Sequence, residues 1–383
     1  MTWAGRDWLG TMPQHRMKPR PIVRLLLLGL AVWLLAGCAT GLPQNSLEPA
    51  SQDARRIDGL FRLTFGIAAV IFVGVQGALI WAAVRYRQRR GEDRPVKQVH
   101  GNNALEIGWT IAPALILVGI ALPTVGTIFD LAEKPANALE VKVIAHQWWW
   151  EFQYPTEEVV TANELHIPVG RPVYLEMTAD DGDVIHSFWV PRLSGKRDVV
   201  PGRTNFLTIE ADEAGTYLGQ CAEFCGLSHA NMRFRVIADP SFDTWLTSQR
   251  AASTIPLGVL VPPPSTTDAG PATTVVAAAV APSDPIAAGW RLFQEKGCST
   301  CHAINGTEAK GGGINPAPNL THVASRSTFA GGLFERTDAN LARWLKDPSA
   351  MKPMQPDQNR GMPALGLTED EIETLVSFLQ SLT

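Results

Sequence analysis

The sequence has no large excess of charge of either sign. Its 33 Lys and Arg residues stand against 37 Asp and Glu residues, which leaves a formal net charge of −4. Nucleic-acid-binding proteins need a basic surface that neutralises phosphates. The charge balance therefore gives no indication of general nucleic-acid binding.

Cysteine is also scarce, and its number is odd. The five cysteines are Cys38, Cys221, Cys225, Cys298 and Cys301. A disulfide framework in a secreted protein usually has an even count and leaves no thiol with another use. Here the five cysteines fall within three chemical motifs, and none is left over. A fold stapled by disulfides is therefore not expected.

The N-terminus resembles an export signal. Basic residues up to Arg24 precede the apolar run LLLLGLAVWLLAGC. Its end, Leu35-Ala36-Gly37-Cys38, resembles the bacterial lipobox, where the chain is cut before a cysteine that then carries lipid. We expect a lipoprotein-type signal peptide over residues 1–37 and lipidation at Cys38. An uncleaved anchor with an incidental cysteine is the alternative, and it too sends the chain into the export pathway.

Two long apolar runs follow, at about residues 63–84 and 109–129. Each approaches the roughly 20 residues that a helix needs to cross a bilayer. The connection between them is basic, and short basic loops stay on the cytoplasmic side. We therefore expect an exported segment over 38–60 and a transmembrane helix hairpin over 61–130. The chain is then a multi-pass protein of the bacterial cytoplasmic membrane, with everything after the hairpin on the periplasmic side.

Residues 138–249 change to short β-rich runs separated by Pro, Gly and Asp. These runs are LEVKVIA, QWWWEFQ, PVYLEMT, GDVIHSFWV, TNFLTIE, GTYLGQ and MRFRVIA. Several alternate with period two, and many short strands separated by turns predict a β-sandwich or barrel. A short helix at about 240–249 is expected to close the domain.

The last third of the chain divides into a linker and a small domain. Residues 250–285 are rich in Pro, Ala, Thr and Ser with almost no charge, which is typical of an extended, semi-flexible linker. Residues 286–383 predict an all-α domain, with helices around GWRLFQEKG, DANLARWLKD and LTEDEIETLVSFLQSL. Thr368 and the acidic residues after it form the start of a capped helix.

The C-terminal domain carries the motif Cys298-Ser299-Thr300-Cys301-His302. In C-x-x-C-H the two thiols can form thioethers to haem vinyl groups, and the His can bind the iron. A redox dithiol or half a zinc site would fit C-x-x-C alone. The adjacent His, the preceding helix and the export signal argue against both. We expect one covalently bound haem c.

A sixth iron ligand lets a haem cycle electrons without binding small molecules, and Met supplies it in many cytochromes c. The candidates are Met351, Met354 and Met362. The domain resembles class I cytochromes c over its whole length. Met362, in GMPAL directly before the last helix and about sixty residues after the motif His, matches that layout. It is the expected ligand, with Met354 next.

The GINPAPNL stretch resembles the loop that lies beside the iron-binding histidine in that family. A proline carbonyl there, of Pro316 or Pro318, is expected to accept a hydrogen bond from His302 and so fix the orientation of the ring. The sequence leaves open which proline does so.

The stretch QCAEFCGLSHANM contains four soft or borderline metal ligands, namely Cys221, Cys225, His229 and Met232. A disulfide would leave the last two unexplained. A structural zinc site has no use for Met, and mononuclear blue copper needs only one Cys. Two thiolates fit if both bridge two copper ions, each with one His. The second His is then expected on a neighbouring strand, and His186 in DVIHSFWVP supplies it.

The pattern H-x34-C-x-E-x-C-x3-H-x2-M, the helix hairpin and the run QWWW resemble cytochrome c oxidase subunit II over residues 55–249. The lipobox and the haem motif extend the resemblance to the cytochrome-c-fused, caa-type form. The implied fold is multidomain, with a two-helix transmembrane hairpin, an all-β cupredoxin-like sandwich and an all-α class I cytochrome c domain. The implied binuclear copper centre, CuA, uses His186, Cys221, Cys225, His229, Met232 and the backbone carbonyl of Glu223.

The resemblance implies further roles. The Glu223 carboxylate points towards a magnesium site shared with subunit I, and Trp148 is where electrons reach the copper. Trp149 departs from the Tyr that members often have, while Trp150 is expected to pack in the core. Asp183 would support the His186 loop or the docking face. Glu106 lies near the mouth of the proton path into subunit I, and a helix cap is its alternative role.

The implied function is electron input to a haem-copper oxidase. Cytochrome c, soluble or fused, would pass electrons through CuA to haem a of subunit I, where oxygen reduction is coupled to proton pumping. Subunit I and subunit III are implied partners, and the chain catalyses nothing alone. A CuA-containing nitric oxide reductase subunit is the main alternative. A quinol oxidase subunit is disfavoured because such subunits lack the copper ligands. A free-standing lipoprotein carrier does not need two membrane helices.

Overall fold

The computed structural model describes residues 25–26, 28–32, 41–87, 98, 100–251, 284–313 and 315–383. The lipobox with Cys38, most of the basic connection and most of the Pro-rich linker lie outside the described residues. The described residues from Pro43 onwards belong to one compact unit.

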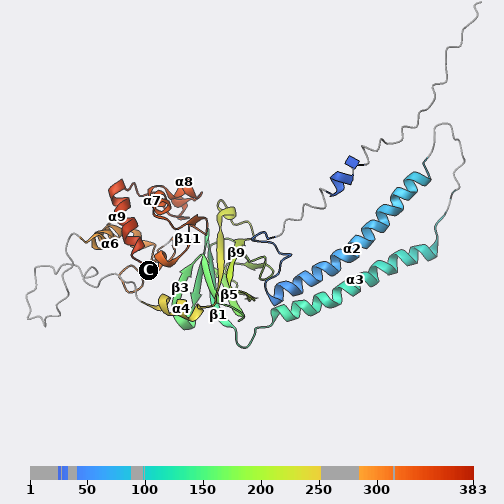
Figure 1. Ribbon diagram of the computed structural model, residues 1–383, viewed down its shortest axis with the longest axis horizontal. Helices are drawn as coiled ribbons and strands as arrows, with labels where there is room; N and C mark the ends of the chain where they lie inside the picture. Colours follow the sequence, from blue (N-terminus) through green and yellow to red (C-terminus); the bar gives the residue numbers. More distant parts are fainter. Residues whose placement is uncertain are drawn as a thin grey trace, which may run out of the picture. The chain divides into compact units, whose positions relative to one another are not determined.

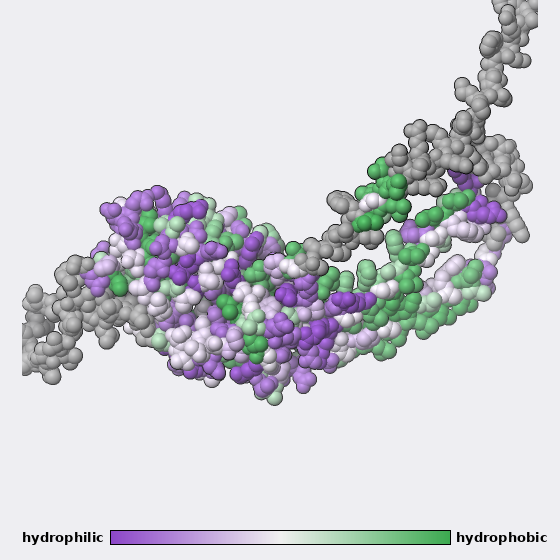
Figure 2. Space-filling view, viewed as in Figure 1, coloured by the Kyte–Doolittle hydropathy of each residue, from purple (hydrophilic) through white to green (hydrophobic). Residues whose placement is uncertain are grey.

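Two long helices, α2 (Gln52–Arg85) and α3 (Asn103–Ala132), correspond to the two apolar runs (Figure 1). Both are long and apolar enough to cross a membrane. Within these two helices only Ala54 is buried, and Figure 2 shows hydrophobic residues along both. Apolar surface exposed over such lengths is unfavourable in water, and a bilayer would accommodate it.

Helix α2 begins at Gln52, before the hairpin start expected at residue 61, so part of the segment expected over 38–60 is helical. Ser51 caps the helix: its hydroxyl accepts a hydrogen bond from the Ala54 N–H at 2.9 Å and donates to the Leu193 carbonyl at 2.6 Å. Arg55, in the next turn, pairs with Asp212. The N-terminal turn of α2 is therefore fixed to the β domain that follows.

The β domain consists of two five-stranded sheets, with strand orders β3-β2-β1-β5-β8 and β4-β10-β9-β6-β7. The strands are β1 (Leu139–His146), β2 (Trp149–Tyr154), β3 (Val159–Ala162), β4 (Glu164–Pro168), β5 (Val173–Ala179), β6 (His186–Trp189), β7 (Arg197–Val199), β8 (Asn205–Ile209), β9 (Gly215–Cys221) and β10 (Arg233–Asp239). Helix α4 (Phe242–Arg250) follows. The predicted β-sandwich with a closing helix is confirmed. The short strands β3, β4 and β7 were not among the predicted runs.

Aromatic rings fill the space between the two sheets. Trp150, Phe188 and Phe234 are completely or almost completely buried, and the ring centroids of Phe188 and Phe234 lie 4.4 Å apart. Gly219 on β9 leaves room for this cluster, because a Cβ atom there would lie 2.2 Å from the Phe234 ring. The expected core role of Trp150 is confirmed.

The C-terminal domain, residues 284–383, is built on α6 (Pro285–Glu295), α7 (Asp338–Lys346), α8 (Pro348–Met351) and α9 (Glu369–Gln380). Helices α6 and α9 approach closely at Gly289, where a Cβ atom would lie 2.3 Å from that of Phe378. Thr368 and Glu371 form a capping box at the start of α9. The predicted helical domain is confirmed, with the addition of a two-stranded sheet, β11 (Thr328–Phe329) and β12 (Phe334–Glu335).

Short 3-10 helices occur in the loops. They are η1 (Pro155–Glu157), η2 (His229–Asn231), η3 (Cys298–Thr300), η4 (Val323–Ser325) and η5 (Pro356–Gln358). Of these, η2 lies in the loop that carries the cysteine-histidine-methionine cluster, and η3 spans the first part of the C-x-x-C-H motif.

Candidate metal centre and haem pocket

Strand pairing assembles the cysteine-histidine-methionine cluster. Strands β9 and β10 are antiparallel neighbours, and the Cys221 N–H donates to the Met232 carbonyl at 2.9 Å, which closes the loop between them. Strand β6 pairs with β9 on its other side, with Phe188 opposite Cys221. His186, at the start of β6, therefore lies beside the loop although it is 35 residues upstream of Cys221.

The donor atoms converge. The ligand atoms of His186, Cys221 and Cys225 lie within 4.8 Å of one another. The two Sγ atoms are 3.7 Å apart, and each faces one imidazole Nδ1, that of His186 at 3.9 Å from Cys221 and that of His229 at 3.5 Å from Cys225. The Met232 Sδ lies 3.8 Å from Cys225 Sγ, and the Glu223 carbonyl lies 3.3 Å from Cys221 Sγ.

These residues fit a binuclear copper site. Both thiols are free, and their separation is far beyond the roughly 2 Å of a disulfide. Thiolate, imidazole and thioether are ligands that copper accepts. Two sulfurs, each next to one imidazole, would supply equal sets of ligands to two metal ions. The described residues thus bring together every copper ligand that the sequence implied.

The two thiols influence each other's protonation. Hydrogen bonding with Cys225, together with a smaller effect of His186, outweighs burial and lowers the pKa of the Cys221 thiol to about 3. The pKa of Cys225 is raised, first because of its hydrogen bond with Cys221 and then because of burial. Two buried thiolates side by side repel each other, and bound cations remove that repulsion.

The run QWWW fixes the metal-binding loop from one side. The side chains of Gln147 and Trp148 both donate to the Cys225 carbonyl, at 2.6 and 2.9 Å. Trp148 is only 2% exposed. Trp149 instead stacks on His146, with ring centroids 4.2 Å apart. Of the three tryptophans, Trp148 is the one whose side chain is hydrogen-bonded to the loop.

Asp183 lies behind His186. Its Oδ1 atom is 3.6 Å from His186 Nε2 and 3.4 Å from Nη1 of Arg360, which belongs to the C-terminal domain. Burial lowers the pKa of His186, but hydrogen bonding to Asp183 and Cys221 outweighs this effect and raises the pKa overall. The geometry allows both roles expected of Asp183, support of the His186 loop and contact with a docked domain.

The C-x-x-C-H motif begins at η3, directly after α6. The Nδ1 atom of His302 donates to the Pro318 carbonyl at 2.8 Å, so the structure selects Pro318 over Pro316. Burial lowers the pKa of His302. A neutral imidazole with its Nδ1 held in this way has its Nε2 free to bind a metal.

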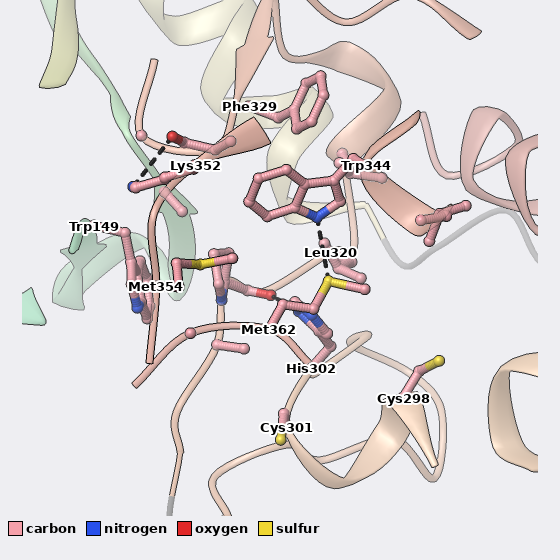
Figure 3. A pocket seen from close by; sticks show the side chains of 18 of the residues that line it. Trp149, Cys298, Cys301, His302, Leu320, Phe329, Trp344, Lys352, Met354 and Met362 are labelled. Atoms are coloured by element: carbon pink, nitrogen blue, oxygen red, sulfur yellow. Dashed lines mark hydrogen bonds between the residues drawn. The ribbon is translucent and has the colours of Figure 1, made fainter. Parts of the chain in front are cut away.

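A mainly apolar cavity opens beside His302 (Figure 3). Cys298 and Cys301 line it, together with a wall of large side chains: Leu320, Phe329, Leu341, Trp344 and Leu345. Two thiols and an imidazole at one apolar cavity fit a covalently attached haem.

Both Met354 and Met362 line this cavity. Met362 packs against the core of the C-terminal domain, and its Sδ accepts a hydrogen bond from Trp344 Nε1 at 3.2 Å. Met354 packs against the core of the β domain instead. A ligand held by the core of the domain that carries the C-x-x-C-H motif would keep its position independently of the other domain, which favours Met362.

Sequence reasoning missed that the cavity is shared. Trp148, Trp149, Ala162 and Asn163 of the β domain line it, and so does Lys352 of the C-terminal domain. The run QWWW marked Trp148 and Trp149, but no local motif marks the other positions or shows that the cavity is shared, because the contact depends on how two separately folded domains meet. The sequence also gave no sign that the side chains of Glu164 and Lys352 would be buried where the two domains meet.

Glu106 lies exposed in the first turn of α3. Its carboxylate accepts a hydrogen bond from the Asn102 N–H at 3.3 Å, while the Asn102 side chain accepts from the N–H groups of Ala104 and Leu105. This is the geometry of a helix cap, the alternative considered for Glu106. Cys38 lies outside the described residues.

Three segments of the chain match known protein families. Residues 42–126 match a family model described as cytochrome C oxidase subunit II, transmembrane domain, and residues 157–238 match cytochrome C oxidase subunit II, periplasmic domain. Residues 286–383 match cytochrome c.

Individual proteins are similar to most or to part of the chain. Cytochrome c oxidase subunit 2 of Alkalihalophilus pseudofirmus is 36% identical over 94% of this chain and 96% of the relative. Quinol oxidase subunit 2 of Bacillus spizizenii is 34% identical over 59% of this chain and 72% of the relative. The crystal structure of the periplasmic domain of subunit II of cytochrome oxidase (CoxB) of Bradyrhizobium japonicum is 30% identical over 30% of this chain and 96% of that chain, with a TM-score of 0.28.

Metal analysis tests the binuclear site. We expect about two copper ions and one haem per purified chain, with the paramagnetic signal of one electron shared by two coppers. Cys225→Ser should remove the shared-electron signal and leave the haem attached, because the two cysteine motifs lie in separate domains. The Cys298→Ser, Cys301→Ser double variant is the matched control and should show the reverse. One copper per chain, or zinc, would contradict the assignment.

Proposed function

Since the chain belongs to the cytochrome c oxidase subunit II family, we propose that it is the electron-input subunit of a caa-type haem-copper oxidase. Membership makes it part of an oxidoreductase complex in partnership with subunit I. In the proposed route, electrons from cytochrome c reach CuA through the fused C-terminal domain and then pass to haem a. Oxygen reduction and proton pumping occur in subunit I, and this chain performs no catalysis alone.

One observation carries the proposal: Trp148 touches both redox sites. Its indole donates to the Cys225 carbonyl inside the cysteine loop, and the same residue lines the cavity beside His302. A buried aromatic side chain between two such sites is suited to be the point where electrons enter the copper centre. Trp149 also lines the cavity, but it stacks on His146.

The proposed ligands follow from the geometry. Copper is held by the side chains of His186, Cys221, Cys225, His229 and Met232 and by the Glu223 carbonyl. Haem c is held by Cys298, Cys301, His302 and Met362. The bound groups supply the one-electron couples, while the protein buries and orients the ligands. We also propose that the Glu223 carboxylate contributes to a magnesium site shared with subunit I.

The proposed location is the bacterial cytoplasmic membrane, with both redox domains on the periplasmic side. Two helices of membrane-spanning length and the match to a periplasmic domain support this placement. Signal cleavage, lipidation at Cys38, the association with subunit III and the use of a soluble cytochrome c donor are further proposals that rest on family resemblance.

Purification of the intact complex from the membrane tests the function. We expect this chain to copurify with a haem-a-containing subunit and to support oxygen consumption with reduced cytochrome c. Cys225→Ser should reduce that activity to background while the complex still assembles. A complex without haem a, or one that reduces nitric oxide and not oxygen, would favour the nitric oxide reductase alternative.

The iron ligand can be tested separately. Met362→Ala should convert the haem c spectrum from low-spin to high-spin and allow carbon monoxide to bind, because the sixth position becomes free. Met354→Ala is the matched control, since this residue lines the same cavity, and it should keep the low-spin spectrum. An unchanged spectrum in Met362→Ala would transfer the ligand assignment to Met354.

We propose that Glu106 takes part in proton uptake as well as capping α3. Glu106→Gln should slow oxidase turnover by about tenfold or more and leave the rate of copper reduction unchanged. Asn102→Ala, which removes the cap hydrogen bonds but keeps the carboxylate, is the control. Turnover untouched by Glu106→Gln, or slowed equally by Asn102→Ala, would leave only the cap role.

A further inference from the structure

The β domain and the C-terminal domain meet in a contact that includes buried groups. The Ser228 hydroxyl donates to the Pro353 carbonyl at 2.6 Å, and the Arg233 N–H donates to the Gly331 carbonyl at 3.1 Å. Gly331 allows the close approach: its φ is +80°, and a Cβ atom there would lie 2.9 Å from the Asn231 carbonyl oxygen. Contacts between backbones across an interface require one defined orientation of the two domains.

Glu164 of the β domain is enclosed by the C-terminal domain. The residue begins β4 and is only 2% exposed. Its carboxylate accepts hydrogen bonds from the N–H groups of Ser327 and Thr328, at 3.1 and 2.9 Å, and from both of their hydroxyls. All four donors belong to the C-terminal domain. A carboxylate that accepts this many bonds is strongly stabilised by its partners.

Lys352 of the C-terminal domain makes the complementary contact. It is 3% exposed, and its Nζ donates to the Trp148 carbonyl of the β domain at 2.6 Å and to the Ala330 carbonyl at 3.2 Å. The amine lies at the shared cavity (Figure 3). Burial lowers the pKa of Lys352 to about 7, and the nearby Cys225 charge opposes that effect. The nitrogen donates hydrogen bonds in either protonation state.

Glu and Lys are almost never fully buried unless they are paired. Here each domain buries one such side chain against groups of the other, so neither contact exists when the domains separate. Burying such a group on docking has a desolvation cost, and these hydrogen bonds across the contact offset it. A tethered carrier that docks transiently would gain nothing from burying these groups at its contact surface.

We propose that Glu164 and Lys352 form a two-point latch that holds the C-terminal domain against Trp148. The linker then joins two docked domains and does not serve as the tether of a moving carrier. The latch rests on the proposed function in one respect only, the identity of the copper centre and the haem c that the two domains carry. It bears on the electron path because it holds Trp148 in place. Lys352 donates to the Trp148 carbonyl, and the Trp148 indole donates to the Cys225 carbonyl.

Cleavage of the linker tests the latch, because it shows whether the C-terminal domain stays bound without its covalent connection. Oxidase turnover does not have to be measured. A protease site is inserted within residues 255–280 of the full chain, and the complex that contains this chain is purified. After cleavage, absorbance measures how much haem c stays with the membrane-bound part. We expect the unaltered chain to retain its C-terminal domain through size-exclusion chromatography. Glu164→Gln and Lys352→Met should each weaken retention by on the order of tenfold to a hundredfold, because the buried donors around Glu164 and the buried carbonyls around Lys352 lose their hydrogen-bond partner.

Matched controls keep the test specific. Glu158→Gln and Lys310→Met change exposed residues in the same two domains and should leave retention unchanged. Thr328→Val, which removes one donor to Glu164 at almost constant volume, should weaken retention less than Glu164→Gln does. Copper and haem content of each variant shows that both domains are folded. Release of the domain from the unaltered chain, or full retention in both latch variants, would overturn the proposal, whatever the oxidase activity shows.

Discussion

Two buried thiols 3.7 Å apart are the constraint on which the rest of the arrangement depends. Unligated thiolates so close together would repel each other, so the loop is stable with both deprotonated only if cations share them. Each thiol then needs its own imidazole, which one residue of the same loop and one residue of β6 supply. The pairing of β6 with β9 meets this requirement by placing His186 beside Cys221.

The same loop connects the copper site to the rest of the molecule. The Cys225 carbonyl accepts hydrogen bonds from both Gln147 and Trp148, so the start of β2 is fixed relative to the thiols. Trp148 in turn presents its own carbonyl to Lys352 of the C-terminal domain. A continuous series of hydrogen bonds thus joins the metal loop to the domain that carries the haem motif.

The two domains keep separate hydrophobic cores but share the cavity beside His302. Separate cores let each domain fold around its own ligands, as the packing of Met362 within the C-terminal core illustrates. The shared cavity and the buried side chains of Glu164 and Lys352 then define a single orientation between the domains.

The sequence by itself determined the ligand sets and the kinds of domain. The spacing within a motif is local, so the ligands from Cys221 to Met232 and from Cys298 to His302 could be identified directly from the sequence. Because two thiolates imply two copper ions, each with one histidine, the motif also required a second, distant histidine. Alternation of apolar residues gave the longer strands but not the short β3, β4 and β7, and apolar length located the two helices without their first turns. Tertiary structure alone decided that Pro318, and not Pro316, accepts the hydrogen bond of His302, and that Glu164 and Lys352 lie between the domains. The sequence separation of these residues carries no pattern, because the contacts arise only when loops within one domain, or the surfaces of two domains, pack together.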